Sequence, residues 1–481
     1  MIRLIQNDQT YNNDIRAMLM AFYPGVRIRE EFTLDKENCI FTCEILFSEN
    51  VSSIRIYGKA VPDDEVLTKN VPGDYRDKET FRNKFKLASY ELMVAMTGKE
   101  LPWGDLTGVR PTKIAMSKLQ SGSSFEETVD YYKSVYKTSE NKARLATSVA
   151  AKEQELLLDI DREKDYCLYV GIPFCPSRCL YCSFTSYPIE KYGDKVDEYI
   201  DKLCRELDYI AEIRNDKRLV AVYIGGGTPT SMDAGQLDRL LIKIEDTFPM
   251  ETVREFTVEA GRPDSIDEDK LRVMKAHKVT RISINPQTMN DETLEVIGRA
   301  HNSEQARHAF KLARECGFDN INMDIIAGLP GETAEHMAYT LKCIRELKPE
   351  SITVHSLAIK RAANLKGRLD ELGDVIHRDM NDMLDMVENT AESLGMEPYY
   401  LYRQKIIGGI LENVGYARPR SECLYNVLIM EEVTDIIAAG AGGSTKLVYP
   451  DENRVERIEN CKSVDDYIQR FDEMLNRKKD I

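Results

Sequence analysis

Long hydrophobic runs are absent from the 481-residue sequence. No stretch approaches the roughly 20 apolar residues of a membrane span. The segment Met1 to Asp8 has no apolar core of a signal peptide. We therefore expect a cytoplasmic protein with no stable membrane insertion. Basic residues are outnumbered, 65 against 81 acidic ones, and the formal net charge of −16 argues against non-specific nucleic-acid binding. The sequence does not predict the oligomeric state.

Cysteine is not abundant enough for a disulfide framework, with 11 residues in 481. Outside one short loop, no two cysteines show the C-x2-C spacing of a metal-binding pair. We interpret these as buried or surface thiols in a reducing compartment. They are Cys39, Cys43, Cys167, Cys204, Cys316, Cys343, Cys423 and Cys461.

The remaining cysteines form the motif C-x3-C-x2-C, with Cys175, Cys179 and Cys182. Three thiolates on one loop suit three irons of a [4Fe–4S] cluster and leave the fourth iron free to bind a small molecule. The alternative is a structural zinc site. Such a site needs four ligands, and no C-x2-C or H-x3-H partner pair is present to complete it. The spacing therefore favours a cluster that performs chemistry.

Short β-branched runs alternate with helical segments in the middle of the chain, which predicts an α/β fold with a parallel sheet. We expect a partial (β/α)6 TIM-like barrel over 161–365, an α+β accessory domain over 1–160 and a C-terminal accessory region over 366–481. In such barrels the chemistry lies at the carboxyl ends of the strands. The six expected strands are 166–171, 220–225, 254–259, 279–285, 320–326 and 351–357.

Outside the barrel, residues 39–47 and 51–58 are expected to form two strands joined by a short turn. Apolar residues recur at helical spacing over 79–97 and 377–395, which predicts an amphipathic helix in each segment. A charged helical connector is expected over 138–163. Between the first helix and the connector, the Gly- and Pro-containing segment from Leu101 to Lys113 is expected to be a loop.

A glycine run ends the second expected strand, in Tyr223-Ile-Gly-Gly-Gly-Thr-Pro-Thr230. Glycines allow a backbone to approach a ligand closely, and exposed carbonyls can accept hydrogen bonds from an ammonium group. The alternative is a plain tight turn. The candidate ligand-binding residues here are Gly225, Gly226, Gly227 and Thr228.

The cysteine motif after a strand, with the aromatic Tyr181 just before the last cysteine, resembles the radical S-adenosylmethionine (SAM) superfamily. The glycine run resembles the superfamily's GGE-type motif. This resemblance implies that SAM binds the open iron and is cleaved to give a 5′-deoxyadenosyl radical. It also implies further SAM contacts from successive strands, although each residue alone could be structural. These are Glu259, Gln287, Arg299 and Asp324.

The span 165–360 is similar to the oxygen-independent coproporphyrinogen III oxidase family, in which Tyr169 matches a cofactor-contacting tyrosine. The segments 106–113, 354–361 and 399–404 resemble the HemZ group of coproporphyrinogen dehydrogenases. This resemblance implies oxidative decarboxylation of coproporphyrinogen III propionates without oxygen. It also implies a tetrapyrrole substrate and a reductant such as flavodoxin or ferredoxin.

One position departs from the decarboxylase pattern. Those enzymes carry a further cysteine in a C-x-C arrangement, whereas this chain has Cys182-Ser-Phe184. Heme chaperones of the same superfamily share the C-x-Phe pattern. Two alternatives to the decarboxylase therefore stay open: a heme-binding chaperone on the same scaffold, and a radical SAM enzyme that opens heme anaerobically.

Substrate contacts are predicted from charge, because tetrapyrroles carry propionates. His301 and His355 are candidates for heme ligation or proton transfer. The cationic candidates are Arg110, Lys113, Lys360, Arg361 and Arg403. For each candidate, histidine or cation, the alternative is a structural or solvated role.

Overall fold

The structure is a computed structural model in which two compact units are described: residues 1–151 with 401–412, and residues 152–400 with 413–481. Among the described residues, no helix is long and apolar enough to cross a membrane. The ranges described are 1–30, 39–62, 65–182, 184–357, 380–406, 409–452, 454–479 and 481.

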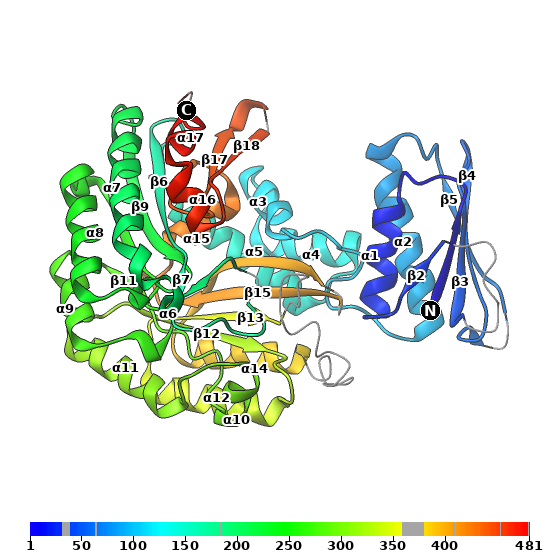
Figure 1. Ribbon diagram of the computed structural model, residues 1–481. Helices are drawn as coiled ribbons and strands as arrows, with labels where there is room; N and C mark the ends of the chain where they lie inside the picture. Colours follow the sequence, from blue (N-terminus) through cyan, green and yellow to red (C-terminus); the bar gives the residue numbers. More distant parts are fainter. Residues whose placement is uncertain are drawn as a thin grey trace. The chain divides into compact units, whose positions relative to one another are not determined.

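The first unit begins with a mixed sheet in the order β2-β1-β3-β4-β5, against one face of which α1 and α2 lie (Figure 1). The predicted strand pair is confirmed as the antiparallel β3 and β4, and the predicted helix as α2. Asp77 caps the start of α2 and Gly98, at φ 66°, ends it. Strands β1 and β5 and helix α1 were not predicted. The elements are β1 (Ile2–Gln6), α1 (Asn12–Phe22), β2 (Ile28–Arg29), β3 (Phe41–Leu46), β4 (Val51–Tyr57), β5 (Leu67–Pro72) and α2 (Lys78–Thr97).

The same unit continues with α3 (Thr112–Gln120), α4 (Phe125–Tyr136) and most of α5 (Glu140–Leu156), which confirms the expected connector helix. Before α3, the predicted loop is held by Arg403. Its guanidinium donates to the Leu106 carbonyl at 2.7 Å. Two of the three segments that resemble the HemZ group, 106–113 and 399–404, therefore meet through Arg403.

The second unit contains the barrel. In the part of the chain that is described, its six parallel strands lie in the order β13-β12-β11-β10-β9-β6, and every predicted strand is present. The sheet does not close on itself, as expected for a partial barrel. The strands are β6 (Asp165–Ile172), β9 (Arg218–Gly226), β10 (Glu255–Val258), β11 (Arg281–Ser283), β12 (Ile321–Ala327) and β13 (Ser351–Ser356).

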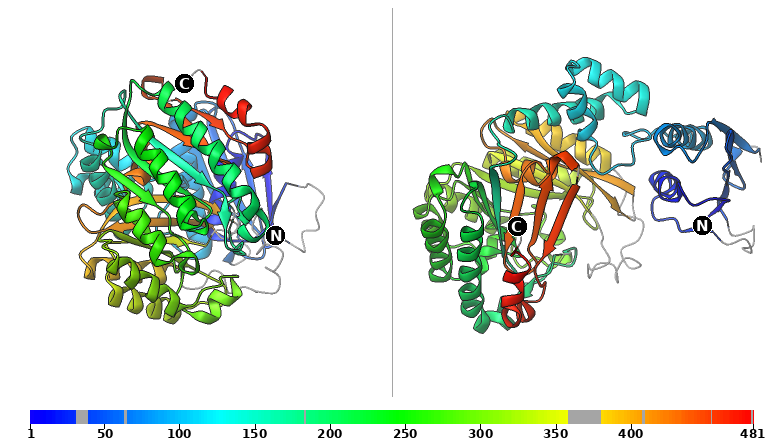
Figure 2. Two further views of the ribbon diagram at one scale, coloured as in Figure 1. Left: turned by 60° about the vertical axis from the view of Figure 1, so that its left-hand side comes forward. Right: turned by 90° about the horizontal axis from the view of Figure 1, so that it is seen from above.

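Helices cover the outside of this sheet (Figures 1 and 2). In α7 the side chains of Tyr199, Leu203 and Leu207 lie along one stripe and are fully buried. Truncating such a core leucine to alanine typically costs about 2–5 kcal/mol. The helices are α7 (Val196–Ile213), α8 (Ala234–Thr247), α9 (Glu268–Ala276), α10 (Asp291–Val296), α11 (Ser303–Glu315), α12 (Ala334–Leu347) and α14 (Met380–Ser393).

The C-terminal region extends the barrel sheet at both ends. Strand β16 (Asp435–Ala439) pairs in parallel with β6, and β17 (Ser444–Tyr449) and β18 (Arg454–Glu459) follow it. At the other end, β15 (Gly409–Ala417) pairs antiparallel with β13, and β14 (Glu397–Ile406) forms the edge. The short helix α15 (Leu424–Glu431) connects β15 to β16. These pairings were not predicted.

Candidate functional site

The cysteine loop follows β6 at the carboxyl edge of the barrel sheet. Cys175 and Cys179 are buried, and Cys182 is partly buried. The Cys182 amide donates to the Cys179 carbonyl at 3.2 Å, which closes the turn between them. The Leu180 amide donates to the Ile297 carbonyl at 3.0 Å, so the loop is fastened to the segment after α10.

Burial opposes ionisation of two of the loop thiols. It raises the pKa of Cys175, and a side-chain contact with Thr228 at 3.5 Å lowers it in part. Burial also raises the pKa of Cys182, and the neighbouring Cys179 and Cys175 add to the effect. A bound cation would therefore favour the thiolate form of both residues.

Within the described ranges, no three His, Cys, Asp or Glu side chains are grouped to hold one metal ion. The cluster ligation by Cys175, Cys179 and Cys182 stays a prediction.

The glycine run lies directly against the start of the cysteine loop. The Gly227 amide donates to the Ile172 carbonyl and the Thr228 amide to the Phe174 carbonyl, both at 2.7 Å. A Cβ on Gly227 would lie 2.5 Å from the Phe174 carbonyl oxygen, and Gly226 has φ 108°. Gly227 has no room for a Cβ, and the backbone of Gly226 adopts a conformation that favours glycine. The run is therefore required for packing as well as suited to a ligand.

Glu259 follows β10 and faces the glycine run. Burial raises the pKa of Glu259 to about 7, despite hydrogen bonds from the Tyr223 hydroxyl and the Gly226 backbone that lower it. Asp324 is near enough for its charge to raise this pKa further. Glu259 is therefore a carboxyl group that a bound cation would convert to the carboxylate near neutral pH.

Gln287 and Asp324 lie side by side on neighbouring chain segments. The Gln287 amide donates to the Asp324 carbonyl at 3.0 Å. Gln287 has φ 68°, unusual for a residue with a Cβ. Its buried side-chain oxygen has no hydrogen-bond partner among the residues that the structure describes. A strained backbone and an unpartnered buried acceptor together are typical of a ligand-binding position.

Asp324 is held in its ionised form. Burial acts to raise its pKa, but the nearby His355 and a hydrogen bond from Asn322 outweigh it and lower the pKa of Asp324. Asn322 Nδ2 lies 2.7 Å from Asp324 Oδ1, and His355 Nε2 lies 3.8 Å from Asp324 Oδ2. A fixed carboxylate on β12 is suited to accept hydrogen bonds from a sugar diol.

Arg299 contacts the cysteine loop. Its Nη2 donates to the Tyr181 hydroxyl at 2.7 Å, and its Nη1 to the Asn285 carbonyl at 3.4 Å. Nearby Tyr181 and Cys179 raise the pKa of Arg299 despite its burial, so the cation is retained. Tyr181 therefore connects the cluster loop to the predicted SAM contact.

Tyr169 stacks on two tyrosines inside the barrel. Its ring centroid lies 6.3 Å from that of Tyr223 and 6.2 Å from that of Tyr425, with interplanar angles of 14° and 23°. Burial raises the pKa of Tyr169 far above the working range, so its hydroxyl remains protonated. Tyr425 reaches this stack from α15.

Among the predicted substrate contacts, His355 lies beside Asp324. Lys360 and Arg361 lie outside the described residues. Arg110, Lys113 and Arg403 belong to the other unit, and Arg403 is buried against backbone carbonyls. His301 is also buried.

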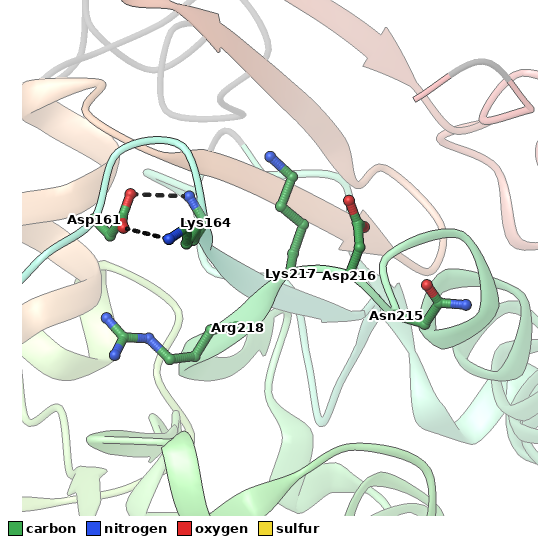
Figure 3. A pocket seen from close by; sticks show the side chains of 6 residues that line it. All are labelled: Asp161, Lys164, Asn215, Asp216, Lys217 and Arg218. Atoms are coloured by element: carbon green, nitrogen blue, oxygen red, sulfur yellow. Dashed lines mark hydrogen bonds and ion pairs between the residues drawn. The ribbon is translucent and has the colours of Figure 1, made fainter.

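A cavity of about 360 Å³ lies at the opposite edge of the barrel sheet. Its lining comes from the segments that precede β6 and β9 (Figure 3). Because it borders the amino ends of these strands, it is not part of the site around the cysteine loop. Its lining residues are Asp161, Lys164, Asn215, Asp216, Lys217 and Arg218.

Sequence reasoning did not identify Tyr223, Asn322 or Arg262 as members of this site. Tyr223 lies two residues before the glycine run on the same strand, which is a usable signal because alternate side chains share a face. Arg262 follows Glu259 closely in a loop, and the spacing of residues in the sequence does not predict the course of this loop.

The fold and the site together define a radical SAM protein. The model of the radical SAM superfamily matches residues 169–344. The solved structure of Escherichia coli HemN, described as a coproporphyrinogen III oxidase and radical SAM enzyme, superposes with a TM-score of 0.51 at 24% identity, covering 68% of this chain and 73% of HemN.

HemZ of Bacillus subtilis, an oxygen-independent coproporphyrinogen-III oxidase-like protein, is 37% identical over 452 residues, which is 92% of this chain and 90% of HemZ. The chain belongs to this family of HemZ-type radical SAM proteins. Heme chaperone HemW of the same organism is 38% identical over 193 residues, 40% of this chain and 50% of HemW. Relatives thus have more than one named activity.

The cofactors of this family are a [4Fe–4S] cluster and S-adenosylmethionine. The residues present fit both groups. Three soft thiol donors stand on one loop, and the unpartnered Gln287 oxygen and the glycine run lie at the same edge of the sheet.

Proposed function

We propose that the chain is a radical SAM enzyme that removes carbon dioxide from the propionate side chains of coproporphyrinogen III without oxygen. The observation that carries this proposal is the connected set of residues at the carboxyl edge of the barrel. It runs from the cysteine loop through Glu259, Asp324 and Gln287 to Arg299. The 37% identity to HemZ over nearly the whole chain supports the substrate class.

In this proposal Cys175, Cys179 and Cys182 hold the cluster. When bound, the cluster and SAM supply a 5′-deoxyadenosyl radical. The run from Gly225 to Thr228 offers backbone groups to the amino group of SAM. Glu259 supplies an anion for the same end of the cofactor.

Three other residues are assigned to the carboxylate, the ribose and a further polar group of the cofactor. Arg299, held by its hydrogen bond to the Tyr181 hydroxyl, binds the carboxylate of SAM in a charge-assisted contact. Asp324, kept ionised by His355, accepts hydrogen bonds from the ribose hydroxyls. Gln287 presents its unpartnered side-chain oxygen to a donor of the cofactor.

With both groups bound, the chemistry they would supply is removal of a hydrogen atom from a propionate side chain. Loss of carbon dioxide, and of one electron to an external acceptor, would then leave a vinyl group. A flavodoxin or ferredoxin is the proposed reductant of the cluster. Burial around the cysteine loop limits access of water to the reacting atoms.

The test is anaerobic incubation of the reconstituted protein with SAM, a reductant and coproporphyrinogen III, followed by product mass. The proposal expects 5′-deoxyadenosine and successive losses of carbon dioxide from the tetrapyrrole. Formation of 5′-deoxyadenosine with unchanged coproporphyrinogen would reject the substrate and retain the radical chemistry.

A second candidate function is heme transfer, which is favoured by one observation. Phe184, two residues after the last loop cysteine, has 66% of its surface exposed. An exposed aromatic side chain is suited to stack on a porphyrin face. Stoichiometric heme binding that suppresses SAM cleavage would favour this function over decarboxylation.

A further inference from the structure

Arg262 is a buried cation that touches the cysteine loop. It lies in the segment after β10, and 4% of its side chain is exposed. Its Nη1 donates to the Ser177 carbonyl at 3.1 Å and to the Ser177 hydroxyl at 3.0 Å. The same nitrogen lies 3.6 Å from Cys179 Sγ, within the range of a hydrogen bond to sulfur. One guanidinium nitrogen thus contacts both the backbone and a thiol of the loop.

The far side of this guanidinium is held by an anion. Nε and Nη2 of Arg262 bind the two carboxylate oxygens of Asp264 at 2.9 and 2.6 Å. His301 Nδ1 lies 3.7 Å from Asp264 Oδ1. Burial acts to raise the pKa of Asp264, but His301 and Arg262 outweigh it and keep the carboxyl ionised. A bidentate pair of this kind fixes both the direction and the charge of the guanidinium.

A cation in this position would affect the reduction potential of an iron–sulfur cluster held by the loop. Reduction of an iron–sulfur cluster adds one negative charge, which a nearby cation stabilises. Hydrogen bonds to the ligand sulfurs and the local charge are the protein's means of setting the cluster potential. Arg262 supplies both at the Cys179 sulfur, while Asp264 offsets part of the charge.

We propose that Arg262 is a positioning residue for the cluster: it donates a hydrogen bond to the Cys179 ligand and raises the reduction potential. Asp264 is the counterion that sets the size of this effect. The inference rests on the proposed function, because it takes Cys179 as a cluster ligand. It adds that two side chains of the protein, Arg262 and Asp264, set the reduction potential of the cluster.

The experiment is a potentiometric titration, followed by electron paramagnetic resonance, of the reconstituted full-length protein and two variants. Arg262→Gln removes the cation, and we expect the reduction equilibrium to shift at least tenfold toward the oxidised cluster, about 59 mV more negative. Asp264→Asn removes the counterion and leaves the cation, so its potential should become more positive. Arg272→Gln, on the exposed Arg272–Glu268 ion pair of α9, is the matched control and should leave the potential unchanged.

The opposite signs make the test decisive, because general loosening of the site would move both variants in the same direction. Either variant with full iron content and a wild-type potential overturns the proposal, as does a negative shift in both. If Arg262→Gln holds no cluster, Asp264→Asn decides alone: a positive shift supports the proposal and any other result overturns it. Wild-type protein that binds no cluster would instead reject the proposed function.

Discussion

Replacing Glu259 with glutamine should weaken SAM binding in a pH-dependent way. Glutamine keeps an acceptor for the Tyr223 hydroxyl and removes the negative charge. The pKa of Glu259 is raised to about 7 by burial, so the wild-type group is mostly ionised at pH 8 and mostly protonated at pH 6. The Glu259→Gln variant resembles the protonated wild type. The SAM dissociation constants of the two proteins should therefore become more similar as the pH falls.

The size of the convergence follows from the titration. The ionised fraction of a group with a pKa near 7 changes about tenfold between pH 8 and pH 6, which corresponds to about 1.4 kcal/mol of binding free energy. The ratio of the variant and wild-type dissociation constants should thus shrink by up to about tenfold over this interval. Titration of the amino group of SAM itself cancels in the ratio.

Isothermal titration calorimetry with the oxidised cluster measures both dissociation constants without cleavage of SAM. The reasoning is refuted if the ratio of the constants is the same at pH 6 and pH 8. It is also refuted if the variant binds SAM as tightly as the wild type at pH 8. Wild-type protein and variant must carry equal iron for this comparison.

The same substitution should stabilise the cluster-free protein. The pKa of Glu259 is higher in the folded protein, about 7, than its ordinary value of 4.5. Such a group favours the folded state while it is protonated, and its contribution to the free energy of unfolding is lost as the pH rises from about 4.5 to about 7. The ionised Glu259 therefore costs stability at pH 8, by up to about 3 kcal/mol. Glu259→Gln should unfold at a higher temperature than wild type at pH 8 and show a smaller difference at pH 5.

Three further predictions concern other contacts. Cys179→Ala should abolish cluster binding in an iron assay, whereas Cys316→Ala, at the partly exposed end of α11, should bind iron like the wild type. Tyr181→Phe should weaken SAM binding about two- to tenfold in calorimetry, because the Arg299 guanidinium loses its anchor, and equal affinity would show that the anchor has no effect. His277 lies between Glu245 and Asp238 carboxylates, which raise its pKa despite burial. Its contribution is therefore complete below pH 6.5 and lost as the pH rises through the folded pKa, so His277→Gln should lower the melting temperature at pH 6 more than at pH 9.

Local patterns sufficed to predict the barrel. The β-branched runs and amphipathic stretches recur in regular alternation, and six parallel strands are present where they were expected. The pairings of β15 and β16 with this sheet could not be predicted, because they join residues far apart in the chain. No local period encodes which strand edge a distant segment will meet.

Only part of the candidate site was predicted, because some of its contacts join segments far apart in the sequence. The family resemblance assigns Glu259, Gln287 and Asp324 to cofactor contacts. In the structure the Gln287 amide donates to the Asp324 carbonyl, and the charge of Asp324 acts on Glu259. Arg262 was missed because its contact with Cys179 crosses between two loops. Arg403 was interpreted as a substrate contact from its charge alone, whereas its guanidinium is occupied by backbone carbonyls of the Leu101–Lys113 segment.

Transfer of hydrogen from substrate to cofactor tests the central claim most directly. Coproporphyrinogen III deuterated on its propionate side chains would be incubated anaerobically with the reduced protein and SAM, and the 5′-deoxyadenosine analysed by mass spectrometry. The proposed function predicts 5′-deoxyadenosine that carries one deuterium, together with a tetrapyrrole that has lost carbon dioxide. Undeuterated 5′-deoxyadenosine with intact coproporphyrinogen would contradict it.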